Sequence, residues 1–316
     1  MDVCRKAIRW IYMVDLGLAL LMAVLLAILE FDVVPFHRLG FFCNDPKISF
    51  KFTGDTISMA LLIVFSISLP LVMMYITEYV CHNANNYEKA SCRTRGRIWF
   101  WYGHYFAGLS TLTFVCELTK LLIGEPRPHF LDTCKPREVA NCTDEYISFY
   151  TCTNTEFSKW FVNDSSKSFP SGHSALSVYT SIFLVWYLQN RLPNRTMFLK
   201  PWLQCLISVW AVICSTTRVS DNRHHWWDVL VGDVLGLLFG VFVVVIPCQH
   251  FYFKRIDATV TVKHTLNEPL ENGQIISGYN KIQHQQSDKQ LSSAIDSEDR
   301  EMKNVTTWRE YTMEEA

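Results

Sequence analysis

Six uninterrupted apolar runs constrain the fold of this 316-residue chain more than any other feature. Each run is close to the roughly 20 residues that a helix needs to cross about 30 Å of hydrocarbon. Hydrophobic residues make up 49% of the chain and charged residues only 19%, which is apolar for a water-soluble protein. The sequence therefore predicts an all-α polytopic membrane protein, with six transmembrane helices near Trp10–Leu29, Thr56–Thr77, Trp99–Lys120, His173–Gln189, Trp202–Thr217 and Asp228–Pro247.

Lysine and arginine residues near the ends of the runs predict the orientation. They precede the first run, separate the second from the third and the fourth from the fifth, and follow the sixth, at Arg5, Lys6, Arg9, Lys89, Arg93, Arg95, Arg97, Arg191, Arg195, Lys200, Lys254 and Arg255. All fall on one face, which the positive-inside rule makes cytoplasmic, with both termini inside. The first run is too long for a signal peptide and lacks a cleavage pattern, so we expect a retained span. The plasma membrane is the expected location, with the endoplasmic reticulum and Golgi as alternatives.

Four cysteines fall in the two long loops on the opposite face, at Cys43, Cys134, Cys142 and Cys152. That face is oxidising in the secretory pathway of a eukaryotic cell, so disulfides are expected there. Four cysteines allow three pairings, and the sequence does not choose among them.

The same loops carry two Asn-x-Ser/Thr sequons, so we expect Asn141 and Asn163 to be glycosylated. From about Asp257 onward the chain is polar and has few large apolar residues, a composition typical of disorder. We therefore divide the chain into a six-span membrane domain, residues 1–256, and a disordered cytosolic tail, residues 257–316.

The residues most capable of chemistry gather at four span ends. They are Lys120 and Arg127 after the third run, Ser171, Gly172 and His173 opening the fourth, Arg218 closing the fifth, and His224 and Asp228 opening the sixth. By parity, all four ends lie on one membrane face, and the charge distribution makes it the outer one. We expect these residues to form one pocket at that boundary.

Three cations in such a pocket need an anionic partner, because unpaired charge at the edge of a low-dielectric region is costly. Arginine offers planar bidentate donors to phosphate oxygens, and lysine a compact point charge. The fourth run begins at Ser171 and Gly172, where free backbone N–H groups and the positive end of a helix dipole favour an anion. Lys120, Arg127 and Arg218 therefore predict a phosphate site together with this helix start.

Two histidines and one carboxylate then suffice for covalent phosphoryl transfer. His224 and Asp228 are spaced i, i+4, so the carboxylate can orient one ring nitrogen and leave the other free as a nucleophile. His173 can protonate the leaving group and later take a proton from water. This chemistry needs no metal or cofactor, and we expect neither. The net charge of −1 comes without a basic patch, so no nucleic-acid partner is expected.

At these residues the chain resembles the type 2 phosphatidic acid phosphatase superfamily, and within it the animal lipid phosphate phosphatases. The three signatures read Lys120-Leu-Leu-Ile-Gly-Glu-Pro-Arg127-Pro128, Pro170-Ser-Gly-His173 and Thr217-Arg218-Val-Ser-Asp-Asn-Arg-His224-His-Trp-Trp-Asp228. The family usually has Ser where Thr217 stands, and Glu125-Pro126 and Trp227 are atypical of the animal branch.

The resemblance implies a six-helix core similar to vanadium haloperoxidases and a metal-independent activity. Its implied substrates are lipid phosphate monoesters: phosphatidate, lysophosphatidate, sphingosine 1-phosphate and ceramide 1-phosphate. It assigns His224 as nucleophile, His173 as acid and Asp228 as orienter, and it places Lys120, Arg127, Ser171, Gly172 and Arg218 on the phosphate. Family members associate, so a homo-oligomer is also expected.

Other interpretations stay open from the sequence. A single cation at a span end usually extends to the headgroups. Glu117 can pair with Lys120 one turn later, and Asp15 and Asp233 can be satisfied within the bundle. His225 points about 100° away from its neighbour on a helix, so we leave it out of the site. A silent lipid-binding relative and a carrier are the competing functions, but every motif position is filled, and no paired broken spans are visible.

Overall fold

The computed structural model describes residues 2–31, 33–84, 91–143, 145–192 and 197–251. The predicted tail, residues 257–316, lies outside the described residues. Six long helices match the six apolar runs: α1 (Asp2–Glu30), α2 (Met59–Ala84), α3 (Ser91–Ile123), α6 (Gly172–Arg191), α7 (Leu199–Ser220) and α8 (Trp226–Val245). Most of them extend beyond the predicted runs, because polar residues continue the helical backbone past the apolar stretch.

By length and composition, five of these helices can cross a membrane: α1, α2, α3, α7 and α8. The sixth, α6, has 20 residues but a more polar composition, because it lies inside the bundle with most of its side chains buried. Its hydroxyl groups are paired there. Thr180 Oγ1 lies 2.9 Å from Tyr105 Oη, and Ser181 Oγ donates to the carbonyl of Ile207 at 3.0 Å. The prediction of an all-α multi-pass membrane protein is confirmed, with the central helix shielded from lipid.

A row of glycines brings α8 against α6. Gly232 and Gly236 are one helical turn apart, and a Cβ at either position would collide with the backbone carbonyl of Ser171 or Ala175. Small residues at this spacing let two helix backbones approach closely. The start of α8 is thereby held beside the start of α6, where Ser171 donates its backbone N–H to the carbonyl of Asp228 at 3.0 Å.

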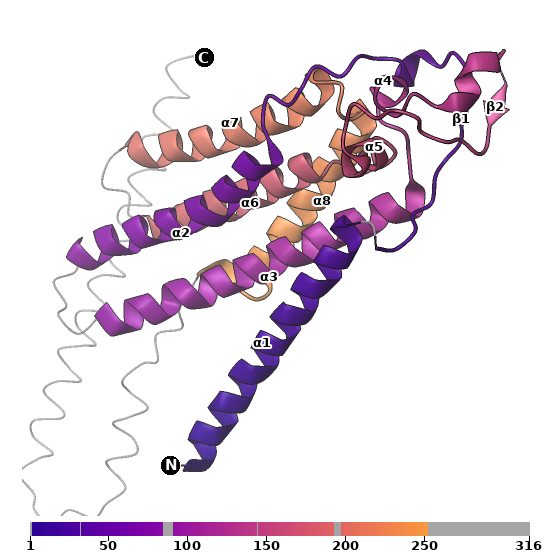
Figure 1. Ribbon diagram of the computed structural model, residues 1–316. Helices are drawn as coiled ribbons and strands as arrows, with labels where there is room; N and C mark the ends of the chain where they lie inside the picture. The colour runs from indigo at the N-terminus through magenta and orange to yellow at the C-terminus, as the bar shows by residue number, and fades with distance from the viewer. Residues whose placement is uncertain (1, 32, 85–90, 144, 193–196, 252–316) are drawn as a thin grey trace, which may run out of the picture. The chain divides into compact units, whose positions relative to one another are not determined.

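Short elements in the loops gather where α6 begins (Figure 1): β1 (Phe41–Phe42), η1 (Pro46–Ile48), α4 (Phe130–Cys134), η2 (Arg137–Asn141), β2 (Tyr146–Ile147) and α5 (Lys159–Asp164), while η3 (Gln249–Phe251) follows α8. Strands β1 and β2 pair antiparallel, with Phe41 opposite Ile147. Of the three disulfide pairings that the sequence leaves open, the structure has Cys43–Cys142 and Cys134–Cys152. The first bond joins the loop after α1 to the loop after α3, and the second closes a turn within the loop after α3.

Candidate functional site

The ends of α3, α6, α7 and α8 meet at one place, which we call the site end. The backbone N–H of His224 donates to the carbonyl of Arg218 at 3.1 Å, so the turn after α7 folds back on that helix. The Nζ atom of Lys120 lies 3.6 Å from where a Cβ would stand on Gly172. The predicted convergence of the motif residues is therefore present in the fold.

Arg127 follows α3 and is held by Asp164 at the end of α5. Its Nη2 donates to the Asp164 carboxylate at 2.7 Å, and its Nε donates to the backbone carbonyl of the same residue at 2.9 Å. Burial alone would raise the pKa of Asp164, but Arg127, Arg223 and Lys120 together lower it. Asp164 is therefore ionised at neutral pH and fixes the direction of the Arg127 side chain.

Arg218 ends α7 and is fully buried, with 0% of its surface exposed. Its Nη1 donates to Asp55 at 3.0 Å and its Nη2 to Asp221 at 3.1 Å, while its Nε has no hydrogen-bond partner among the described residues. A buried donor without a partner costs free energy, so this N–H is available to a ligand.

Lys120 lies in the last turn of α3 and donates to Glu117 at 2.7 Å. The predicted pairing of these two residues is confirmed. Lys120 is 5% exposed and acts electrostatically on both His173 and His224. Its charge is therefore only partly neutralised and contributes to the potential of the site.

The two motif histidines are buried in the same place. His173 stands in the first turn of α6, where Ser171 is the N-cap residue, and its Nε2 atom has no partner among the described residues. His224 turns Nδ1 toward the Asp228 carboxylate, 3.7 Å from Oδ2, which is slightly too long for a hydrogen bond. The Nε2 atom lies on the other side of the ring, as a nucleophile oriented by Asp228 requires.

The electrostatics of the site keep His224 neutral. Burial, then the positive charge of Arg127, lower the pKa of His224 to about 3, although the nearby Asp228 carboxylate opposes this shift. A neutral imidazole has a free electron pair on one ring nitrogen at physiological pH. The ring is therefore in the form that a nucleophile needs.

Asp228 is held by groups around it as well as by its place in α8. Its Oδ2 atom accepts hydrogen bonds from Ser168 Oγ at 2.5 Å and from the backbone N–H of His225 at 3.0 Å. The second bond belongs to the capping box that starts α8. Helix capping and the orientation of His224 therefore depend on the same carboxylate.

The sequence interpretation missed the acidic partners of the arginines, namely Asp55, Asp164 and Asp221, as well as Ser168 and Arg223. Asp221 and Arg223 stand inside the third motif, so their position was a signal. Asp55 and Asp164 lie in segments far apart in the sequence, and Asp164 was visible only as the middle residue of a glycosylation sequon.

The structural roles predicted for Asp233 and Asp15 differ in outcome. Asp233 accepts from Ser215 at 2.7 Å as expected, whereas Asp15 is exposed on α1.

One group of potential metal ligands lies beside the site, formed by Glu125, His225 and Asp228, whose ligand atoms are within 4.8 Å of one another. Glu125 Oε1 and Asp228 Oδ2 already accept hydrogen bonds. Glu125 Oε1 accepts from Trp227 Nε1 at 3.0 Å, and the Trp227 ring stacks on His225 with the centroids 4.4 Å apart. Burial, and then the charge of Asp228, raise the pKa of Glu125. The two atypical positions of the motifs, Glu125 and Trp227, are thus direct partners.

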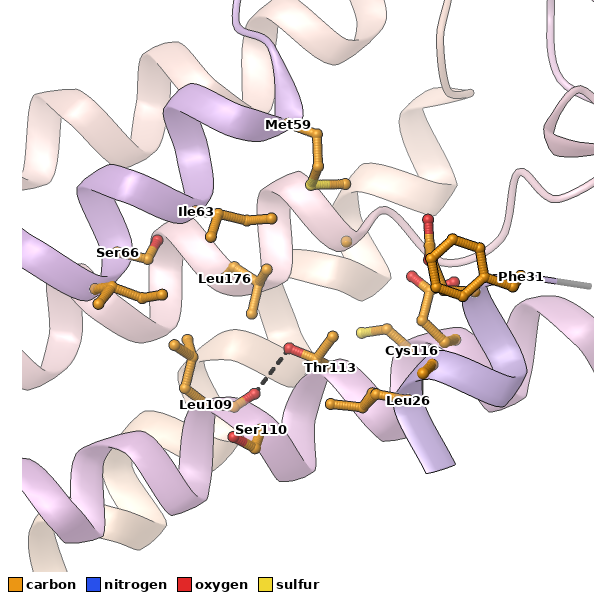
Figure 2. A pocket seen from close by; sticks show the side chains of 15 residues that line it. Leu26, Phe31, Met59, Ile63, Ser66, Leu109, Ser110, Thr113, Cys116 and Leu176 are labelled. Carbon is orange, nitrogen blue, oxygen red and sulfur yellow. Dashed lines mark hydrogen bonds between the residues drawn. The ribbon is translucent and has the colours of Figure 1, made fainter. Parts of the chain in front are cut away.

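An apolar cleft of about 410 Å³ leads to the site between four helices. Figure 2 shows Leu26 of α1, Ile63 of α2, Cys116 of α3 and Leu176 of α6 lining this cleft. Its lining also includes Gly172, at the start of α6 and beside Lys120. A ligand with a hydrocarbon part in the cleft would therefore place its other end among the cations.

Comparisons with known proteins identify the family. The family model described as PAP2 superfamily matches residues 101–251. The chain is 34% identical to phospholipid phosphatase 1 of Mus musculus over 242 residues, which cover 75% of this chain and 84% of the relative. It is 32% identical to phospholipid phosphatase 2 of Homo sapiens over 248 residues, covering 75% and 82%.

A putative phosphatidate phosphatase of Drosophila melanogaster is 28% identical over 262 residues, covering 76% of this chain and 67% of the relative. No solved structure matches the chain. The identities and the coverage are sufficient to assign the family. The chain belongs to the PAP2 superfamily and, within it, is an enzyme of the phosphatase class related to the phospholipid phosphatases.

Proposed function

We propose that the protein is a metal-independent lipid phosphate phosphatase that hydrolyses phosphate monoesters through a phosphohistidine intermediate. The observation that carries this proposal is the convergence of three buried cations, Lys120, Arg127 and Arg218, on two buried histidines. Buried cations of this density are stable only with anions nearby, and Arg218 Nε and His173 Nε2, which have no hydrogen-bond partner among the described residues, can bind a phosphate.

In the first step, the Nε2 electron pair of His224 attacks phosphorus and the bond to the ester oxygen breaks. His173 enters this step protonated, balanced by the anionic phosphate beside it, and transfers its proton to the departing alkoxide. The product alcohol leaves, and phosphate stays on His224. Asp228 stabilises the positive charge that the ring acquires.

In the second step, neutral His173 takes a proton from water, whose oxygen attacks phosphorus and breaks the bond to His224. Orthophosphate leaves, and both histidines return to their starting states. Lys120, Arg127 and Arg218 stabilise the negative charge on the equatorial oxygens in both steps, together with the Ser171 hydroxyl group and the backbone N–H of Gly172 at the start of α6.

The cleft between α1, α2, α3 and α6 supports a lipid as the substrate. It is lined mainly by apolar side chains and reaches Gly172, so a hydrocarbon tail can lie among the helices while the phosphate enters the site. Burying each CH₂ group there contributes about 0.8 kcal/mol to binding. The substrates we propose are phosphatidate, lysophosphatidate, sphingosine 1-phosphate and ceramide 1-phosphate.

The proposal puts the site end at the extracellular or luminal face, with both termini cytosolic, and the distribution of Lys and Arg supports this orientation. The proposed location is the plasma membrane. The proposal includes N-glycans on Asn141 and Asn163. In the structure the Asn163 side-chain oxygen accepts from Arg38 at 3.2 Å, and Ser165 of the sequon is buried, so its glycan would be added before folding. A glycosidase-sensitive mass shift that disappears when Asn141→Gln and Asn163→Gln are combined tests the membrane face. A homo-oligomer stays a prediction from the family resemblance.

The test is orthophosphate release from detergent-solubilised protein, with EDTA present, across a panel of phospholipid and sphingolipid monophosphates. We expect release with EDTA, and a loss on the order of 10⁶-fold in the His224→Ala variant, which lacks the nucleophile. Acid-labile ³²P on the wild type, absent from the variant, would identify the phosphohistidine. If wild type and variant released phosphate equally, the mechanism would be wrong.

A silent lipid-binding protein would bind the same lipids without release, and a carrier would move them between vesicles without release. The same measurement therefore separates the proposal from both competing functions.

A further inference from the structure

Arg223 lies between the two arginines of the site and is not one of the motif residues to which the resemblance assigns a role. Its Nη2 lies 3.4 Å from Asp164 Oδ2, and its Nε forms an ion pair with Asp55 Oδ1 at 3.1 Å. Asp164 is the carboxylate that holds Arg127, and Asp55 is one of the two that hold Arg218. Positive and negative side chains therefore alternate from Arg127 to Arg218, with Arg223 in the middle.

The Arg223 side chain is fixed by more than its charge. Its guanidinium group lies over the rings of Phe52 and Phe161, 5.4 and 5.2 Å from their centroids. Its Nη1 donates to His129 Nε2 at 2.9 Å, and His129 Nδ1 pairs with Thr133 Oγ1 at 3.2 Å. Burial, then the charges of Arg127 and Arg223, lower the pKa of His129, so the ring is neutral and can accept this bond.

These partners come from two segments between long helices, and Arg223 itself lies in a third. Phe52 and Asp55 lie between α1 and α2, the residues from His129 to Asp164 lie between α3 and α6, and Arg223 itself joins α7 to α8. The residue is 7% exposed, and burial lowers its pKa to about 10, so it is charged at neutral pH. The arginine guanidinium group is planar, always charged and able to donate hydrogen bonds in several directions, so it suits this position.

We propose that Arg223 is a positioning residue, which sets the separation and direction of Arg127 and Arg218 so that both reach the same phosphoryl group. It acts through Asp164 and Asp55 and does not itself touch the substrate. This inference rests on the proposed function, because the phosphoryl group is the ligand that the two arginines share.

The physical reason is a competition for the two carboxylates. Each carboxylate divides its attraction between Arg223 and one site arginine, so neither arginine is drawn fully away from the site. Without the central guanidinium group, Asp164 and Asp55 would each be bound by one cation only, and both would pull Arg127 and Arg218 toward themselves. Misplacement of a substrate-contacting group by about 1 Å is sufficient to cost on the order of 10²-fold in rate.

The test is the Arg223→Lys variant of the full chain, which keeps the charge but loses the fork. We expect kcat/KM for lysophosphatidate to fall by about 10²-fold, and the inhibition constant of orthovanadate, a mimic of the transferred phosphoryl group, to rise in parallel. The matched control is Arg191→Lys, which alters a buried pair with Glu78 at the other end of α6. The control should lower the unfolding temperature without changing vanadate inhibition.

A second variant guards against misfolding of the first. His129→Gln removes the ring that accepts from Arg223 and leaves every cation in place, and we expect vanadate inhibition to weaken in the same direction but less. Unchanged vanadate inhibition in both variants, with an active wild type, would overturn the role of Arg223 alone. A wild type that released no phosphate from any lipid would overturn the proposed function and this inference together.

Discussion

Two buried ionic clusters lie at opposite ends of α6, and they differ in how completely they are paired. At the Arg191 end, Glu78 accepts from Arg191 at 2.8 Å and from Tyr187 at 3.2 Å, and the guanidinium group lies 5.1 Å from the Trp101 ring centroid. No buried polar atom of these residues lacks a partner. This cluster connects α2 to α6 and needs nothing from outside the chain.

The site end is different. Eight buried side-chain atoms have no hydrogen-bond partner within the described part of the chain, and six of them belong to residues at the site end: His173, Arg218, Arg223, His224, His225 and Asp228. The Arg223 atom, Nε, is still ion-paired with Asp55 Oδ1 at 3.1 Å. Folded proteins pair nearly all such groups, so a concentration of incompletely paired ones marks this end as a candidate binding site. Completeness of pairing, more than the presence of charge, therefore distinguishes the functional cluster from the structural one.

Among the substitutions that test the difference between the two ends of α6, loss of His173 should have the largest effect. We expect His173→Ala to lower kcat for lysophosphatidate by about 10²- to 10⁴-fold, because the alkoxide leaves without a proton. With an aryl phosphate that releases nitrophenolate, formation of the phosphoenzyme should be nearly normal, whereas its hydrolysis stays slow. The measurement is stopped-flow release of nitrophenolate, which should show a burst equal to the enzyme concentration. Equal losses with both esters and no burst would argue against the proton transfer.

The next largest effect concerns the cluster at the Arg191 end of α6. Arg191→Ala leaves the Glu78 carboxylate buried, at 2% exposure, without its cation, and should destabilise the fold by about 3–5 kcal/mol. The measurement is unfolding in detergent, followed alongside KM at a temperature where the variant is folded. We expect KM to stay within about twofold of the wild type. A large change in KM with little loss of stability would remove the distinction between the two ends.

The smallest effect is acid sensitivity at the site end. An imidazole in the unfolded chain has a pKa of 6.5, whereas His224 in the fold has a pKa of about 3. Between these values the unfolded chain binds the proton and the folded chain does not, so acidification favours unfolding. Relative to His224→Asn, the wild type should lose about 2 kcal/mol between pH 6.5 and pH 5. The check is the difference in unfolding free energy at the two pH values. A difference independent of pH would contradict a buried neutral ring.

Much of the fold and the cationic half of the site can be predicted from the sequence. The apolar runs place six helices, since backbone groups in hydrocarbon must pair within the segment. Parity then places Lys120, His173, Arg218 and Asp228 at one end without any knowledge of the loops. The central helix departs from the pattern, because a helix surrounded by other helices can carry Thr180 and its paired hydroxyl in place of an apolar residue.

The acidic half of the site could not be predicted in the same way. Asp55 and Asp164 lie in loops with no periodic pattern, and they approach the arginines only through the folding of those loops, which carry two disulfides. Arg223 lies within the third motif, but its proposed positioning role depends on partners from two other loops. Long-range pairing of this kind is decided by tertiary geometry that local sequence does not encode.

The glycine row on α8 has a consequence for how substrate reaches the phosphate site. Because backbone touches backbone between α6 and α8, the helix that carries His173 cannot slide or tilt against the one that carries Asp228 without steric collision. Widening of the entrance for bulky lipids is therefore left to the periphery, where α1 contributes Leu26 and exposes most of its length. Under the proposed function, the closely packed pair α6 and α8 would carry the chemistry, and the exposed first helix would accommodate different lipid tails.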